Sequence, residues 1–135
     1  MTKHGWILLL AAASLVLVAV PTAFAKTGHV AGTTVTVTAG KPSEFGFKLS
    51  TKKVAHGAVT FKITNGGNVP HDFKVCSVPV KGALADTCNG KGTPLISMGA
   101  SKTLAVSFKA PGKYEYLCTV SGHAAAGMKG LVTVK

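Results

Sequence analysis

Short stretches of alternating apolar and polar residues follow one another along most of the chain. The first covers residues 33–39, where Val35 and Val37 share one face. The same period of two recurs in Phe45/Phe47/Leu49, Val59/Phe61/Ile63, His71/Phe73/Val75, Leu104/Val106/Phe108, Tyr114/Tyr116/Cys118 and finally residues 131–134. Alternation with this period is typical of strands buried on one face. The pattern predicts a β-strand for each stretch.

Turn-forming residues separate these stretches. Examples are Lys41-Pro42, Asn65–Asn68 and Ala110–Gly112, and Gly, Pro and Asn are the residues that tight turns require. No stretch has a convincing helical period. We therefore expect an all-β fold, an antiparallel Greek-key β-sandwich of about seven to eight strands.

The alternation fails between Ser77 and Gly99, where Gly, Pro, Ala and Asn dominate. A loop this long inside a domain is usually functional or pinned by other contacts, and a short helix within residues 80–88 is an option. An immunoglobulin-like sandwich is the competing fold, because Tyr116-Leu117-Cys118 resembles its Tyr-x-Cys corner with Cys76 as disulfide partner. The core Trp of that fold is missing, since Trp6 is the chain's only Trp.

The N-terminal residues have the order of a secretory signal peptide. Lys3 precedes the apolar run Ile7–Val20, and small residues end the segment at Ala25. We expect cleavage after Ala25, which gives a signal peptide of residues 1–25 and one domain of residues 26–135. The protein would then be exported, to the periplasm or the extracellular space, and an uncleaved membrane anchor is the alternative.

Positive charge on the chain comes from lysine alone. Once Lys3 leaves with the signal peptide, 14 lysines and four acidic residues give a net charge of +10. Nucleic-acid readers usually use the planar fork of arginine, so we expect no nucleic-acid partner. The charge favours steering toward an acidic docking surface on a partner protein or attraction to an anionic membrane surface.

Residues 112–130 bring together the side chains with the most distinctive chemistry. Cys118, His123 and Met128 are separated by four residues each. Thiolate, imidazole and thioether are the ligands expected of a mononuclear copper centre. If Cys118 binds metal, Cys76 and Cys88 remain as a pair, and an oxidising compartment favours a disulfide between them.

A fourth ligand would come from an upstream histidine: His29, His56 or His71. The last two flank one predicted strand, so only one of them can lie near Cys118. The residues alone do not decide between them.

Two motifs resemble the cupredoxins, the small blue copper proteins of the plastocyanin, azurin and rusticyanin kind. They are residues 68–73, NVPHDF, and residues 112–128, from GKYEYLC to GHAAAGM. The spacing of Cys118, His123 and Met128 is most similar to that of rusticyanin and auracyanin. The resemblance implies one copper ion in a type 1 site with His71, Cys118, His123 and Met128 as ligands, and Met98 is the reserve for the axial position.

The residue after His71 departs from the family pattern. Many members have Asn there, where its side chain ties the two ligand loops together, whereas this chain has Asp72. We expect Asp72 to accept a hydrogen bond from the Thr119 hydroxyl or a backbone N–H. Small apolar residues should form a docking rim around His123; they are Val69, Pro70, Val120, Ala124, Ala125 and Ala126.

These features predict a carrier of single electrons between redox partner proteins, monomeric and not an enzyme. The alternative is a copper-binding protein for storage, delivery or tolerance.

Overall fold

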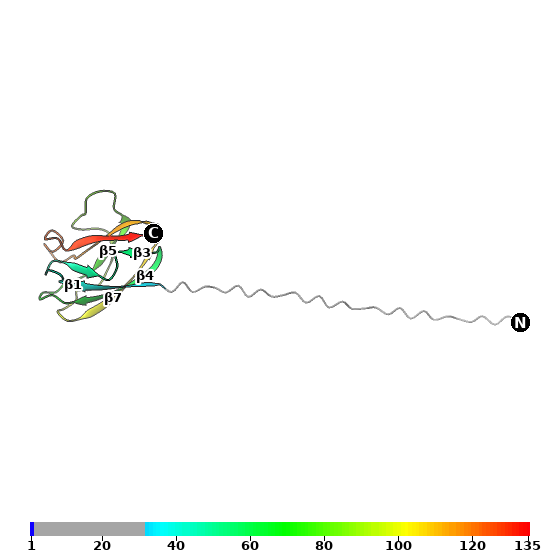
Figure 1. Ribbon diagram of the computed structural model, residues 1–135, viewed down its shortest axis with the longest axis horizontal. Helices are drawn as coiled ribbons and strands as arrows, with labels where there is room; N and C mark the ends of the chain where they lie inside the picture. Colours follow the sequence, from blue (N-terminus) through cyan, green and yellow to red (C-terminus); the bar gives the residue numbers. More distant parts are fainter. Residues whose placement is uncertain (2–31) are drawn as a thin grey trace.

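Two β-sheets form the domain, and they pack face to face around a shared core (Figure 1). The computed structural model describes Met1 and residues 32–135. Apart from Met1, the predicted signal peptide lies outside the described residues, and so does His29. In the part of the chain that is described, no helix is long and apolar enough to cross a membrane.

Within the described residues, nine strands make up the two sheets. One sheet has the order β2-β1-β4-β7, formed by Phe47–Leu49, Thr33–Ala39, Gly57–Asn65 and Ser101–Phe108. The other has the order β3-β9-β8-β5-β6, formed by Lys53–Val54, Lys129–Val134, Gly112–Leu117, Lys74–Pro79 and Gly90–Gly92. The all-β sandwich predicted from the alternation is confirmed.

Two strand pairs differ from the antiparallel prediction. β1 lies parallel to β4, and β3 lies parallel to β9. Parallel neighbours need a long connection, and residues 40–56 supply one between β1 and β4. Alternation records which face of a strand is buried but not the direction of its neighbour, so the sequence did not reveal these pairs.

The core lies between the sheets and is rich in aromatic side chains. Phe73 is fully buried and packs against Phe47, Phe61 and Tyr116, with ring centroids 5.1, 5.3 and 5.4 Å away. Aromatic pairs at such distances stabilise a core beyond the area that they bury. Apolar positions predicted to share a face are buried in this core. The aromatic cluster around Phe73 supports the end of the sandwich that carries His71.

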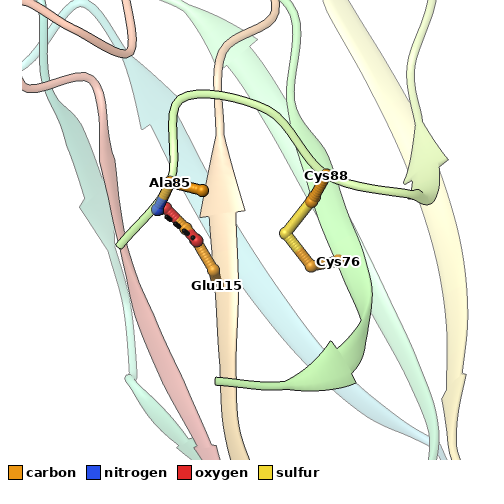
Figure 2. Close-up of a disulfide and its surroundings, with 4 residues drawn as sticks. All are labelled: Cys76, Ala85, Cys88 and Glu115. Carbon is orange, nitrogen blue, oxygen red and sulfur yellow. Dashed lines mark hydrogen bonds between the residues drawn. A yellow bond between two sulfur atoms is a disulfide. The ribbon is translucent and has the colours of Figure 1, made fainter. Parts of the chain in front are cut away.

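The long segment between β5 and β7 is pinned, as its length suggested. Cys76 and Cys88 form a disulfide, which confirms the predicted pair. Figure 2 shows a second tie: the buried Glu115 carboxylate on β8 accepts a hydrogen bond from the Ala85 backbone N–H at 3.1 Å. The segment contains β6 but no helix within residues 80–88.

Phe45 is a further difference from the predicted strands. It was expected on the buried face with Phe47, but it precedes β2 and its side chain is 41% exposed. Its ring lies edge-on to that of His123, with centroids 5.0 Å apart. Phe45 follows the alternating pattern of the sequence, but β2 begins only at Phe47, so Phe45 lies outside the sheet.

Strand directions divide the sandwich into two ends. β1, β4 and β8 all finish at the end that also carries His71, whereas β9 finishes at the opposite end. At that opposite end the backbone N–H of His56 bonds to the carbonyl of Lys135 at 2.9 Å. His56 is therefore remote from Cys118, as its spacing from His71 required.

Candidate metal centre

Three side chains with metal-binding atoms meet at one end of the sandwich. They are His71, Cys118 and His123, whose ligand atoms all lie within 4.8 Å of one another. The Nδ1 atoms of the two histidines are 3.2 Å apart, and Nδ1 of His123 is 3.5 Å from Sγ of Cys118. Three of the four predicted ligand side chains therefore form one cluster.

Cys118 occupies the first position after β8. The strand ends at Leu117 and holds the thiol inside the sandwich, where the residue is 1% exposed. Burial raises the pKa of the Cys118 thiol to about 11, because an apolar environment disfavours the thiolate. In the metal-free protein this cysteine is a thiol, and among the described residues it is the free cysteine.

A tight loop returns the chain from Cys118 to β9. His123 N–H bonds to the Val120 carbonyl at 3.0 Å, and Met128 N–H bonds to the His123 carbonyl at 2.9 Å. Gly122 and Gly127 have positive φ angles of 79° and 107°, which glycine adopts without strain. These bonds hold the imidazole beside the thiol before any metal binds.

Met128 closes the same loop. Its carbonyl accepts a hydrogen bond from the Cys118 backbone N–H at 3.0 Å, and its side chain is fully buried in the main core. The alternative, Met98, is 65% exposed. Burial and the direct link to Cys118 favour Met128 as the thioether of this cluster.

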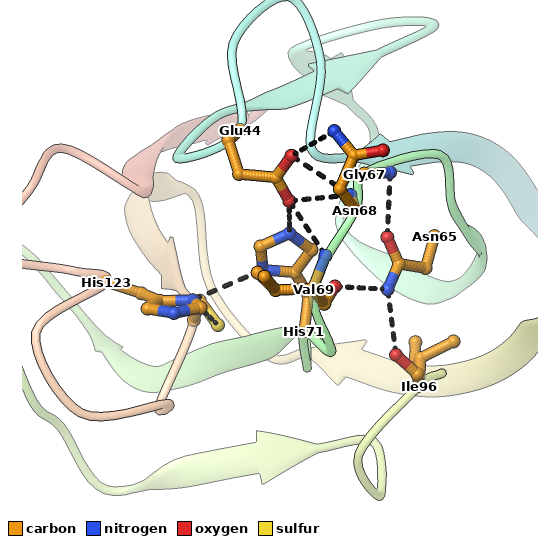
Figure 3. A network of polar contacts seen from close by, with 9 residues as sticks. Glu44, Asn65, Gly67, Asn68, Val69, His71, Ile96 and His123 are labelled. Carbon is orange, nitrogen blue, oxygen red and sulfur yellow. Dashed lines mark hydrogen bonds and ion pairs between the residues drawn. The ribbon is translucent and has the colours of Figure 1, made fainter. Parts of the chain in front are cut away.

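His71 is held by a framework of polar contacts that reaches it from several elements (Figure 3). Its backbone forms an isolated antiparallel bridge with Ile96, with bonds of 3.2 and 2.7 Å. The buried Asn65 amide donates to the carbonyls of Val69 and Ile96, and its oxygen accepts from Gly67 N–H. The loop before His71 is thereby fixed at both of its ends.

Glu44, which belongs to neither of the two ligand motifs, contacts the same imidazole. Its Oε1 lies 2.9 Å from Nε2 of His71, and the carboxylate also accepts hydrogen bonds from the backbone N–H groups of Asn68 and Val69. The hydrogen bond from Asn68, followed by that from His71, lowers the pKa of Glu44 below its ordinary value. Its one sequence signal is scarcity, because the chain has only four acidic residues.

Asp72 ties the two ligand loops together. Its Oδ1 accepts a hydrogen bond from the Thr119 backbone N–H, and its Oδ2 accepts one from the Thr119 hydroxyl. The sequence led us to expect one or the other of these two kinds of bond, and both are present. Asp72 follows His71, and Thr119 follows Cys118. The bonds between Asp72 and Thr119 therefore fix the distance between the side chains of His71 and Cys118.

His123 lies at the edge of the cluster and is partly exposed. Its pKa is lowered, mainly by desolvation and next by the proximity of His71. The predicted apolar rim is present in part, because Val69, Pro70, Ala125 and Ala126 are exposed whereas Ala124 is buried. Phe45 adds an aromatic ring to this rim.

The cluster fits a copper ion by its chemistry. Nε2 of His71 faces the Glu44 carboxylate, and Nδ1 on the other side of the ring faces Nδ1 of His123. Two imidazole nitrogens and one sulfur form a set that suits both copper oxidation states. A cation between the facing nitrogens would satisfy all three groups at once.

The chain matches a family model described as copper-binding proteins of the plastocyanin/azurin family, over residues 33–135. Among related proteins, it is 28% identical over 123 residues to the copper-resistant cuproprotein CopI of Rubrivivax gelatinosus, a match covering 84% of this chain and 74% of that protein.

Solved structures of copper proteins are also similar to this chain. Reduced auracyanin from Roseiflexus castenholzii is 25% identical with a TM-score of 0.59, and the match covers 77% of this chain and 98% of that one. Rusticyanin from Thiobacillus ferrooxidans is 26% identical with a TM-score of 0.55, and the match covers 76% of each chain. Both have the fold described above.

Proposed function

The chain belongs to the plastocyanin/azurin family of copper-binding proteins, and from this premise we propose that it carries single electrons between redox partners. Copper bound at the site supplies the chemistry by alternating between Cu(II) and Cu(I). The proposed ligands are His71, Cys118, His123 and Met128. The observation that carries the proposal is the preformed cluster of two imidazoles and a thiol, with one imidazole at the protein edge.

The residues around the cluster limit its rearrangement when the electron moves. Cys118 and His123 are each bonded through their backbones to Met128, and Asp72 joins the His71 loop to the Cys118 loop. A site held in this way keeps one geometry that both oxidation states accept. Because the ligands move little when the electron moves, the site favours rapid electron exchange over catalysis or long-term retention of copper.

His123 provides the route to a partner. It is the partly exposed member of the cluster, whereas His71 and Cys118 are buried. Exposed apolar side chains lie on the segments that flank it, among them Phe45 and Val69. Redox encounters typically use small interfaces, and an apolar rim around one imidazole suits brief docking of a partner with an acidic surface around its contact patch.

Electron exchange between copies of the protein tests this function. When reduced and oxidised copper-loaded protein are mixed, NMR resonances of residues around His123 should broaden as the oxidised fraction increases, because electrons exchange between molecules. Resonances of the reduced form that keep their linewidth as the oxidised fraction increases would contradict an electron-transfer role.

Copper storage, delivery or tolerance is the second candidate, and the similarity to a protein named as copper-resistant favours it. That role needs tight uptake of copper without fast electron exchange. The same NMR mixture distinguishes the two functions, because a storage protein would bind copper and the resonances of its reduced form would not broaden as the oxidised fraction increases.

We also propose that the protein works outside the cytoplasm after cleavage of residues 1–25. A disulfide between Cys76 and Cys88 supports this location, because such bonds form and persist in oxidising compartments.

A further inference from the structure

The Glu44 carboxylate lies directly behind a predicted copper ligand, His71. Figure 3 shows Glu44 at one edge of the His71 ring and His123 at the other. The hydrogen bond from Nε2 to Oε1 measures 2.9 Å, and the His71 side chain is fully buried while that of Glu44 is 27% exposed. The ring therefore links a negative charge at the surface to the interior cluster.

The position of this carboxylate is fixed by the backbone around it. Glu44 accepts from Asn68 N–H at 2.9 Å and from Val69 N–H at 3.2 Å, while the Asn68 side-chain amide donates to Oε2 at 3.3 Å. A side chain at Gly67 would collide with Glu44 Oε1 and would meet His71 Nε2 at 2.9 Å. Glycine at position 67 therefore lets the carboxylate and the imidazole approach each other.

We propose that Glu44 is a positioning residue for copper, which fixes the His71 tautomer and lowers the reduction potential of the site. This inference rests on the proposed function, since it concerns the same cluster. Because the N–H at Nε2 donates a hydrogen bond to Glu44, Nδ1 keeps its lone pair and faces His123. Metal-binding histidines commonly have such a partner, which raises the basicity of the ligand nitrogen.

The effect on the potential has a clear sign. The Glu44 charge is transmitted through the hydrogen bond to the ring, and a more basic Nδ1 stabilises Cu(II) more than Cu(I). Removal of the charge should lower the affinity for Cu(II) more than the affinity for Cu(I). A tenfold fall in the ratio of these affinities raises a one-electron potential by about 59 mV.

Glu44→Gln tests the proposal with little change in shape, and Glu44→Ala removes the contact altogether. Voltammetry of the copper-loaded variants should give a higher potential than wild type for both, with the thiolate-to-copper absorption band retained in Glu44→Gln. Asp86→Asn is the matched control, since it removes a carboxylate that bonds to Lys129 and to neither histidine; its potential should stay at the wild-type value. A Glu44→Gln potential equal to that of wild type would overturn the proposal.

A second measurement uses the metal-free protein, so it separates this inference from the proposed function. Nitrogen-15 shifts of His71 should show the proton on Nε2 in wild type and a larger share on Nδ1 in Glu44→Ala. A wild-type proton on Nδ1 would contradict the role of Glu44 whatever the protein does with copper. If the nitrogen-15 shifts place the proton on Nε2 but the copper-loaded wild type is colourless, the proposed electron-transfer function is rejected while the role of Glu44 in fixing the tautomer stands.

Discussion

Each of the chain's four carboxylates accepts a hydrogen bond that organises the structure. Glu44 binds the His71 imidazole, Asp72 binds Thr119, and Asp86 binds Lys129. Glu115 is buried and binds the Ala85 backbone. In a chain with 15 lysines, acidic side chains are therefore concentrated where they fix loops, and two of them serve the metal end.

Copper binding should depend on pH through Cys118. Its pKa is raised to about 11 by burial, so the thiol is protonated at neutral pH, whereas metal binding requires the thiolate. Each copper bound should release this proton, and the affinity should rise about tenfold per pH unit below pH 11. Competition with a chelator between pH 8 and pH 9, above the range in which histidines titrate, measures this slope; an affinity independent of pH would contradict it.

At the residue scale the sequence predicted most of the cluster but not its full support. Cys118, His123 and Met128 lie in one short stretch, so spacing and ligand chemistry were enough to bring them together. His71 needed the family resemblance, because residue spacing left His56 equally open. Glu44 contacts His71 only through the folded arrangement of three loops, and no local pattern records that contact.

At the element scale, the disulfide segment packs against the strand and loop that carry the ligands. Cys76, Leu117 and Ala124 form one buried cluster, and Cys88 packs on it. Leu117 precedes Cys118, and Ala124 follows His123. The pinned segment therefore supports both sides of the ligand loop from outside the main core.

Replacement of both cysteines, Cys76→Ala with Cys88→Ala, should destabilise the protein and leave the copper site coloured. The disulfide joins residues separated by 12 positions, and its loss should lower the free energy of unfolding by about 2–3 kcal/mol. Denaturant unfolding of the metal-free protein measures the change. The double variant avoids an unpaired thiol that would compete for copper. Unchanged stability would contradict the bracing role.

Elements were predictable where they are long and alternating, and missed where they are short. β1 was predicted with its observed bounds, and β4 and β7 were predicted around the apolar residues that define them. β3 and β6 have two and three residues, too few to show a period. Their positions follow from pairing with β9 and β5, which is information that only the folded chain contains.

At the scale of the whole molecule, exposed lysines lie at both ends of the sandwich. Lys52, Lys53, Lys109, Lys113 and Lys135 lie at the end remote from the cluster, and Lys41, Lys48 and Lys102 lie toward the metal end. The metal end also exposes large apolar side chains, namely Phe45, Val69, Leu95 and Met98. A partner that contacts His123 would therefore meet apolar side chains with lysines nearby.

Oxidation of the reduced protein by hexacyanoferrate(III), an anionic probe, should show at which end the electron leaves. Lys41 lies just after β1 at the metal end, whereas Lys113 lies on β8 at the other. Lys41→Gln should slow oxidation at 0.1 M salt more than Lys113→Gln, because screening limits the action of a charge to about 10 Å at that ionic strength. Equal slowing by the two variants in stopped-flow measurements would contradict electron exit near His123.

The visible absorption spectrum of the oxidised, copper-loaded protein shows whether the cluster is a type 1 copper site. A type 1 site with Cys118 as thiolate ligand predicts an intense blue colour from the thiolate-to-copper transition, which Cys118→Ser should abolish. Met128→Leu should keep much of the colour and shift the potential, if Met128 is the axial ligand. A wild-type protein that binds copper and stays colourless would contradict a type 1 site at Cys118.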